Sequence, residues 1–467
     1  MTEQAFQEEA PLAGDKGKII FAIMFVGTFI ATLSQSMMIS ALPTIMGEFH
    51  IDASMGQLLT TSYIFTLGLI AALTAFLISK INTKYLFMAA MLSFVIGCVS
   101  SLFAPNYWLL LASRILQAGG AGISLPLAQV VALHTYPKEE YGRAMGIIGL
   151  IIGFAPAIGP AISGIIIDIW SWRAIFIVLG GIVALVCILA HFYFEDMPIH
   201  QEEEHIDLLS AFLYIAGAIV FMGGVTAVEH YGFWQPASYV PALVGALLIA
   251  LFVRLQLKHT HPLLKISLLK ERGFWVSVML VVLSQIGLMI GAVMVPLFVQ
   301  DVQGLSPTMS GFIILPGAII LGFANPITGR IRDKFGALPL VLGGIFFLGL
   351  GTYAFTLPLE VAPPYVITAL YGFRTLGIAC LMMPMTAHGC SFLPEEDLAQ
   401  ATALITSFRQ IIGSVFTSVL IAIMEYNTHS PIGVDSVGFD MSWSVQTAII
   451  LGIGIFALIA LPKKKSE

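Results

Sequence analysis

Long apolar stretches separated by short polar segments recur along the whole 467-residue chain. A helix needs about 20 apolar residues to cross the roughly 30 Å hydrocarbon core of a bilayer. Windows of this length predict about fourteen membrane helices. Their approximate ranges are 18–45, 55–79, 84–105, 107–134, 142–168, 172–194, 207–229, 237–257, 273–299, 308–329, 337–357, 363–388, 399–425 and 442–461. The pattern therefore predicts an all-α polytopic membrane protein.

The composition agrees with this pattern and adds an orientation. Hydrophobic residues make up 58% of the chain and charged residues 10%, against roughly a quarter charged in an ordinary soluble domain. If the N-terminus is cytoplasmic, the loop lysines and arginines collect on the cytoplasmic side, and only Arg173 lies opposite. We therefore expect a multi-pass protein of the cell membrane, the bacterial inner or plasma membrane, with both termini in the cytoplasm.

An internal repeat divides the predicted helices into two sets. Residues 112–149 and 370–406 each contain an early arginine, a glycine-containing stretch, a proline, a late histidine and an acidic loop. Both copies run in the same direction through the membrane, as in carriers built from two parallel bundles. We expect the following organisation: a cytoplasmic tail at 1–17, a six-helix bundle at 18–194, an acidic cytoplasmic linker at 195–206, two inserted helices at 207–257, a basic amphipathic cytoplasmic segment at 258–272, a second six-helix bundle at 273–461 and a cytoplasmic tail at 462–467.

Motifs of soluble or membrane-embedded enzymes are missing from the sequence. It has no G-x-x-x-x-G-K-[ST], no H-E-x-x-H, no G-x-S-x-G and no C-x-x-C. We therefore expect no enzymatic activity, no cofactor and no metal, and a sensor or enzyme is the weakest alternative. The lipid bilayer is an expected partner and nucleic acid is not, and the chain is expected to act as a monomer.

The segment "GFAPAIGPAISG" (153–164) places two prolines and three glycines inside a predicted span, which a membrane helix tolerates where neighbouring helices pack closely. It resembles the fifth-span signature of the fourteen-span drug/proton antiporters of the major facilitator superfamily. Gly159, Pro160 and Gly164 match that signature, whereas Ala155 and Ser163 replace glycines. We expect these glycines to let the fifth helix cross a helix of the second bundle, and tight packing without gating is the alternative.

Further motifs extend the resemblance over nearly the whole chain. "SRILQAGGAG" (113–122) is similar to the fourth-span motif and carries Arg114 and Gln117, and "GRIRDKFG" (329–336) is similar to the loop motif and carries Asp333. The resemblance implies the major facilitator fold, here two six-helix bundles plus two additional helices, and proton-coupled efflux of hydrophobic or amphiphilic drugs by alternating access. The partners that it implies are a small hydrophobic or amphiphilic substrate and protons. Uptake, or lipid or metabolite movement on the same fold, is the alternative. Two departures are the loop at 79–85, which lacks the usual glycines and Asp, and Ser34, which stands where an Asp is usual.

Three arginines, Arg114, Arg374 and Arg409, lie inside predicted spans. Such residues are costly in a membrane unless they are paired or hydrated, and they commonly face a functional cavity. A structural link to backbone carbonyls is the alternative for Arg114. We expect coupling or gating residues at Arg114, Gln117, Gly159, Pro160, Gly164, Asp333 and Asp168. We expect a substrate cavity lined by Ser34, Gln35, Met38, Arg374, Met383, Arg409 and Gln410, in which methionine suits varied apolar ligands.

Proton coupling requires a group that binds and releases a proton, and Ser34 cannot do so. The acids of the predicted spans lie toward their outer ends, at Asp168, Glu229, Asp301 and Glu425. Asp168 is the favoured relay because it follows the fifth span, and an interfacial contact near Arg173 is the alternative. A cavity without a midplane acid is expected to prefer neutral or weakly basic amphiphiles over dications.

Overall fold

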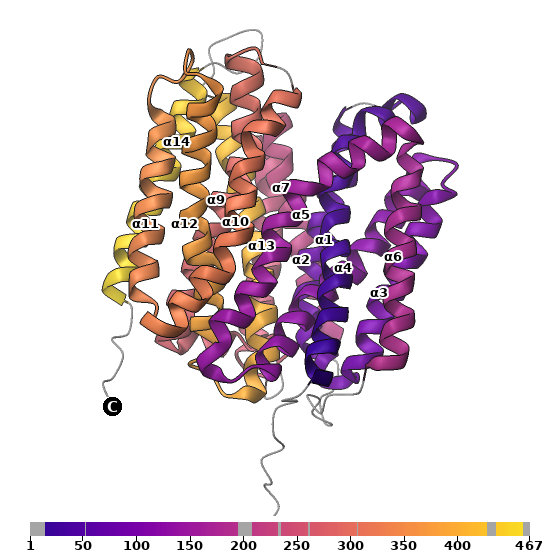
Figure 1. Cartoon of the computed structure of the whole chain (residues 1–467). Helices are drawn as coiled ribbons and strands as arrows, with labels where there is room; N and C mark the ends of the chain where they lie inside the picture. Colours follow the sequence, from indigo (N-terminus) through magenta and orange to yellow (C-terminus); the bar gives the residue numbers. More distant parts are fainter. Residues whose placement is uncertain are drawn as a thin grey trace, which may run out of the picture.

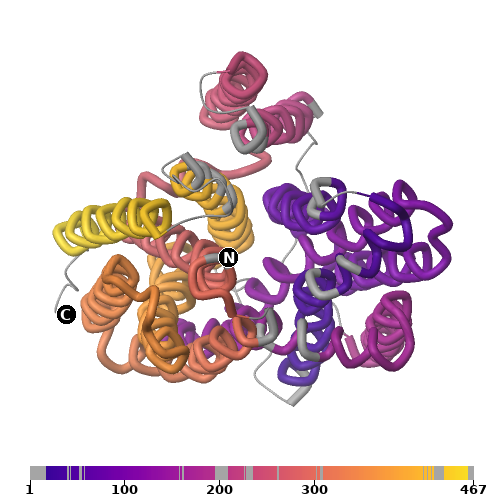
Figure 2. The backbone as a smooth tube through the Cα atoms, turned by 90° about the horizontal axis from the view of Figure 1, so that it is seen from above, coloured from indigo at the N-terminus to yellow at the C-terminus, as the bar shows by residue number. Residues whose placement is uncertain are grey.

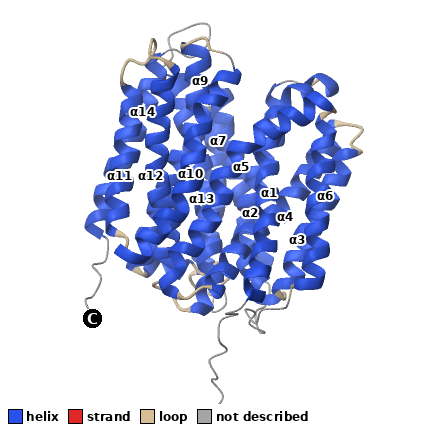
Figure 3. Cartoon of the chain, viewed as in Figure 1, coloured by secondary structure: helices blue, strands red, loops and turns tan. Residues whose placement is uncertain are grey.

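The computed structural model describes residues 15–51, 53–194, 208–231, 235–259, 262–305, 307–426 and 436–460. These residues form fourteen α-helices joined by short connections (Figure 3). The predicted tail at 462–467, the acidic linker at 195–206 and most of the tail at 1–17 lie outside the described residues. The predicted all-α architecture is confirmed. Helices suit a membrane because they satisfy their own backbone hydrogen-bonding groups in hydrocarbon.

The helices fall into two bundles with a helix pair beside them (Figures 1 and 2). The first bundle contains α1 (Asp15–Phe49), α2 (Ala53–Lys80), α3 (Thr83–Leu102), α4 (Tyr107–Thr135), α5 (Tyr141–Ile169) and α6 (Trp172–Tyr193). The pair is α7 (Leu208–Tyr231) and α8 (Pro236–Gln256). The second bundle contains α9 (Arg272–Leu297), α10 (Pro307–Phe335), α11 (Leu338–Tyr353), α12 (Pro364–Cys390), α13 (Leu398–Tyr426) and α14 (Ser436–Ala460).

The two repeated segments adopt the same local structure. In each, a helix containing a proline, α4 or α12, leads to a 3-10 turn and then to a second long helix, α5 or α13. The residue before each turn is a proline, Pro137 or Pro394, and both have φ −66° and ψ 159°. Proline fixes φ near this value and cannot continue the preceding helix, so it ends one span and positions the next.

Twelve helices of the described residues are long and apolar enough to cross a membrane, against the fourteen expected. The other two are α5 and α7. Helix α5 is continuous over 29 residues, and α7 carries a shorter apolar stretch at Leu209–Val225. Helix α7 packs on α8 and reaches the second bundle through a 2.9 Å hydrogen bond between the Tyr214 and Ser407 hydroxyls. The pair lies outside both bundles, beside α13 (Figure 2).

The bundles meet along two pairs of helices, α5 with α10 and α2 with α13. Figure 1 shows the start of α1 and the end of α14 on one side of the molecule, at the bottom. We call this the terminal side. Helix α5 runs obliquely, starting at the terminal side near α10 and ending in the first bundle. This oblique course determines which residues of α5 face the other half.

Candidate functional site

The two halves approach each other closely where the beginning of α5 meets the end of α10. A Cβ added to Gly142 would lie 2.2 Å from the Gly329 carbonyl oxygen, and one added to Gly329 would lie 2.0 Å from the Gly142 carbonyl oxygen. Neither position has room for even a methyl group. The two helices therefore touch through their backbones, as small residues permit in membrane proteins.

This contact continues along the first half of α5. A Cβ on Gly146 would lie 2.7 Å from Pro326 Cα, and Asn325 Nδ2 donates a 2.9 Å hydrogen bond to the Gly149 carbonyl. The rings of Phe154 and Phe323 also lie in contact, with centroids 5.1 Å apart. The glycines at 142, 146, 149 and 153 follow helical spacing and line one face of α5. That spacing is the sequence signal that could have identified this face.

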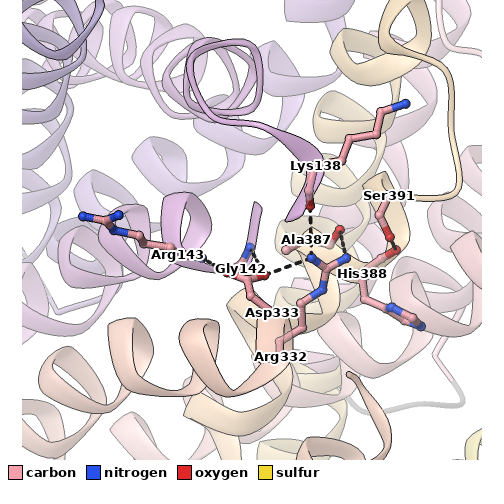
Figure 4. A network of polar contacts seen from close by, with 8 residues as sticks. All are labelled: Lys138, Gly142, Arg143, Arg332, Asp333, Ala387, His388 and Ser391. Carbon is pink, nitrogen blue, oxygen red and sulfur yellow. Dashed lines mark hydrogen bonds and ion pairs between the residues drawn. The ribbon is translucent and has the colours of Figure 1, made fainter. Parts of the chain in front are cut away.

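Asp333 lies at the terminal end of this contact (Figure 4). Its carboxylate accepts hydrogen bonds from the backbone N–H groups of Gly142 and Arg143, each at 2.8 Å. The guanidinium of Arg332 donates to Asp333 at 3.0 Å and to the Ala387 carbonyl at 3.3 Å. A carboxylate here also faces the positive end of the α5 dipole. The acid predicted for gating thus joins the first bundle to α10, and through Arg332 to α12.

The predicted fifth-span residues lie elsewhere. A Cβ on Gly159 would lie 2.0 Å from Ser36 Oγ of α1, within the same bundle, and one on Gly164 meets nothing within 4 Å. The Pro160 side chain is outside the described residues. The structure therefore differs from the expectation that Gly159 and Gly164 approach the second bundle. The reason is the oblique course of α5, whose later part packs on α1 of the first bundle.

Arg114 and Gln117 meet Ser34 in the first bundle, as one polar cluster. Arg114 is fully buried and donates to Ser34 Oγ at 2.9 Å and to Gln117 Oε1 at 2.8 Å. Its guanidinium carbon lies 4.1 Å from the centroid of the Tyr63 ring. Gln117 continues the cluster by donating to Ser101 Oγ at 2.9 Å. Neutral oxygens and an aromatic face surround this charge where the family resemblance would place a carboxylate.

Arg374 makes comparable contacts in the second bundle. It is fully buried, and it donates to Thr352 Oγ1 at 3.1 Å and to the Gly287 carbonyl. Its guanidinium carbon lies 5.4 Å from the Trp443 ring centroid. A Cβ on Gly291 would clash with this guanidinium, at 2.1 Å from Nη1. Arg374, predicted to line the cavity, therefore connects α9, α11 and α14 within its own bundle.

Arg409 lies where α13 faces the first bundle. One turn before it, Thr406 donates to Gln129 of α4 at 3.2 Å. The next residue, Gln410, accepts from Gln285 of α9 at 3.1 Å, and its Cβ is 3.1 Å from a Cβ added to Gly68 of α2. Arg409 is 3% exposed, and its Nη1 lies 3.7 Å from the Met382 sulfur.

The remaining predicted cavity residues are not gathered into one cluster with Arg409. Met38 of α1 and Met383 of α12 are buried, and Gln35 is half-buried. Ser34 belongs to the Arg114 cluster. The polar residues that sequence analysis missed are Gln129, Gln285 and Asn325, which were hidden among apolar neighbours without a motif.

The predicted proton relays are at helix ends. Asp168 is exposed near the end of α5, and the side chains of Glu229, Asp301 and Glu425 are outside the described residues. Within the described part of the chain, the one buried carboxylate is Asp397, at the terminal side, which pairs with Lys265 at 2.6 Å. No described carboxylate is therefore buried near the middle of a span.

Arg173 binds Glu48. The ion pair is 2.6 Å long, and Trp172 Nε1 also donates to Glu48 at 2.6 Å. Partial burial raises the pKa of Glu48, but the hydrogen bonds from Trp172 and Arg173 and the charge of Arg173 outweigh it, so the pKa is lowered. This contact fixes the start of α6 against the end of α1 on the side opposite the termini. The sequence signal for it was the single arginine expected on the side opposite the other loop cations, which needs a counter-ion.

Known proteins resemble the chain in sequence and in fold. Residues 24–418 match the Major Facilitator Superfamily. The chain is 36% identical over 408 residues to the uncharacterized MFS-type transporter YcnB of Bacillus subtilis, covering 87% of this chain and 86% of that protein. It is 31% identical over 414 residues to the lincomycin resistance protein LmrB of Bacillus subtilis, covering 88% of this chain and 86% of that protein. Its fold matches the proton:xylose symporter XylE with a TM-score of 0.66, 14% identity and 97% of each chain.

Proposed function

Because the chain belongs to the Major Facilitator Superfamily, a family of transporters, we propose that it is a secondary active exporter of hydrophobic or amphiphilic small molecules. Resistance to lincomycin, in the name of a 31% identical relative, supports export. The observation that best supports an alternating-access mechanism is the contact between α5 and α10. This contact joins the halves on the terminal side through glycine backbones and one carboxylate.

This contact is suited to a reversible gate. Two helices that touch through glycines have little side-chain interdigitation to undo when the bundles rock. The hydrogen bonds from Gly142 and Arg143 to Asp333 hold the terminal side together in this conformation. Alternating access requires these bonds to break when the substrate site opens toward that side. Asp333 is therefore proposed as a gating residue, together with the Gly142 and Gly329 pair.

The proposed topology has fourteen spans, counting α5 and α7 with the twelve that length and composition identify. Both termini are then cytoplasmic, and the terminal side is the cytoplasmic face. A reporter fused after Lys465 and one inserted in the 195–206 linker should both report the cytoplasm. An external location for the first reporter would contradict the proposed count.

Proton entry is the proposed driving force, and Asp168 is the first candidate relay because it lies near the outer end of α5. The test is substrate flux in proteoliposomes under imposed proton gradients. Wild type is compared with Asp168→Asn, Glu229→Gln and Glu425→Gln. Wild-type flux that does not depend on the proton gradient would exclude proton coupling. Flux that stays gradient-dependent in Asp168→Asn would exclude Asp168 as the relay.

Uptake, or lipid or metabolite movement, is the second candidate, since one fold serves several directions and substrates. A drug-susceptibility panel in cells with and without the protein separates the two. Export predicts raised tolerance to at least one amphiphilic compound in cells that contain the protein. Unchanged susceptibility to every compound, combined with lost growth on one nutrient after deletion, would favour uptake.

A further inference from the structure

The three arginines predicted inside spans, Arg114, Arg374 and Arg409, differ in how their donors are used. Arg114 and Arg374 each donate to at least two oxygens and face an aromatic ring. Arg409 is equally enclosed, yet its polar contact within the described part of the chain is the Met382 sulfur at 3.7 Å. All three guanidiniums keep one buried nitrogen without a partner, Nε of Arg114, Nη1 of Arg374 and Nε of Arg409, so the difference lies in the oxygen acceptors that the first two have and Arg409 lacks among the described residues. Sulfur is a weak acceptor, so this guanidinium retains most of its capacity to donate.

No carboxylate of the described residues pairs with Arg409. The buried carboxylate of the described residues, Asp397, lies three turns back on the terminal side and is bound to Lys265. Near Arg409 the structure instead places the amides of Gln410 and Gln285, and Gln285 Oε1 is also buried without a partner. An unpaired guanidinium in a low-dielectric interior is unstable unless an anion or water reaches it. The site is therefore incomplete as the protein alone forms it.

The depth of Arg409 suits a substrate site. It follows Leu398 by eleven residues, or about 17 Å along the helix, near the middle of a roughly 30 Å hydrocarbon core. The contacts on either side of it, Thr406 with Gln129 and Gln410 with Gly68, join the two halves. Separation of the halves would break these contacts and expose Arg409 to a ligand entering between them.

We propose that Arg409 binds the carboxylate of an amphiphilic anion, whose apolar part lies against Met382 and neighbouring side chains of α12. A guanidinium presents a planar fork of donors that matches a carboxylate, and methionine adapts to apolar groups of different shape. This inference rests on the proposed transport function and narrows it to acidic amphiphiles. It changes the expectation from sequence, which favoured neutral or weakly basic substrates, because no described residue offers the positive charge of Arg409 an oxygen acceptor or a counter-ion.

The test is ligand binding to the purified full-length protein by isothermal calorimetry at neutral pH. The probes are decanoate, cholate and biphenyl-4-carboxylate, each compared with its own primary amide. Wild type should bind at least one acid roughly tenfold to a hundredfold more tightly than the amide, because a charge-assisted pair is stronger than a neutral hydrogen bond. Arg409→Met should abolish that preference while keeping affinity for the amide, and Arg409→Lys should retain part of it.

The matched control is Arg254→Met, which removes an exposed arginine of α8 and should leave the preference for the acid unchanged. Thermal unfolding of each variant verifies that it is folded. If Arg409→Met does not fold, Arg409→Lys and Arg409→Gln give the same comparison. Equal binding of acids and amides, no binding of any acid at millimolar concentration, or an unchanged preference in Arg409→Met would each overturn the proposal.

This experiment separates the inference from the proposed function. Binding through Arg409 without any flux in vesicles would refute export and leave the site intact. Export of neutral or cationic compounds that Arg409→Met leaves unchanged would refute the acidic substrate and leave export intact.

Discussion

Asp333→Asn is the substitution that best isolates the contact between the halves. The two carboxylate oxygens accept from two backbone N–H groups at the start of α5, Gly142 with Oδ1 and Arg143 with Oδ2. An asparagine of the same shape keeps one acceptor and presents an NH₂ group to the other N–H. It also removes the negative charge that faces the helix dipole and the guanidinium of Arg332.

The magnitude follows from those contacts. A hydrogen bond to a charged group contributes about 1.5–3 kcal/mol, and an anion at a helix N-terminus about 0.3–1 kcal/mol. The Asp333 side chain is 15% exposed, so solvent screens only part of this. A net loss of about 2–3 kcal/mol shifts the equilibrium between closed and open terminal sides by roughly 30- to 150-fold.

The assay is a distance measurement between spin labels at Glu139 and Lys334, which are exposed on the two sides of the contact. The four native cysteines, Cys98, Cys187, Cys380 and Cys390, are first replaced. Asp333→Asn should add or enlarge a longer-distance population. The control is Glu140→Gln, which removes a neighbouring carboxylate that pairs with the Arg143 side chain of the same bundle at 3.1 Å. A folded Asp333→Asn protein with an unchanged distance distribution would refute the reasoning.

Two further predictions concern packing and charge. Gly146→Leu should abolish transport while the protein still inserts, because the leucine side chain would meet the backbone of α10. Gly164→Leu should be tolerated because that position is open. Flux and expression of both variants, measured side by side, check these outcomes. Glu48→Gln should lower thermal stability at neutral pH by less than about 1 kcal/mol, since the pair with Arg173 is partly exposed. Because the pKa of Glu48 is lowered, that difference should be full above pH 4.5 and vanish as pH falls through the lower folded value. A difference that persists in acid would contradict it.

Helix positions were predictable because membrane helices are long and uniformly apolar. The predicted range 107–134 corresponds to α4 at Tyr107–Thr135, and 172–194 corresponds to α6 at Trp172–Tyr193. The boundary of α7 is harder, since its apolar stretch is shorter than a span. Local neighbours were predictable in the same way: Gln117 lies one turn from Arg114, and the two do form a hydrogen bond.

The roles of the arginines were not predictable, because they depend on residues distant in sequence. Arg374 and Arg409 look alike in the sequence, as single cations in apolar spans. Thr352 and the Gly287 carbonyl accept hydrogen bonds from Arg374, whereas the Met382 sulfur faces Arg409. The direction of each glycine on α5 depends likewise on the course of that helix. Hydropathy gives no information about the partners of the arginines or the direction of the glycines, because hydropathy depends on composition and not on which helix faces meet.

An anionic substrate also changes how the missing first-span carboxylate is understood. Outward movement of a monoanion from a cell that is negative inside is driven by the membrane potential, at about 2.3 kcal/mol per charge per 100 mV. Such export needs no proton relay, so Ser34 in place of an Asp is compatible with it. Exchange of one anion for one entering proton moves two charges in the same electrical direction.

The number of charges moved is measurable in proteoliposomes with equal pH on both sides. A tenfold gradient of the acid corresponds to about 1.4 kcal/mol, so the potential that stops net flux is about 60 mV for one charge and about 30 mV for two. An imposed pH difference should shift that potential only in the second case. If Asp168 is the relay, we expect Asp168→Asn to change the potential that stops net flux from about 30 mV to about 60 mV. Flux that is independent of potential would contradict both the charged substrate and the role of Arg409 as its binding partner.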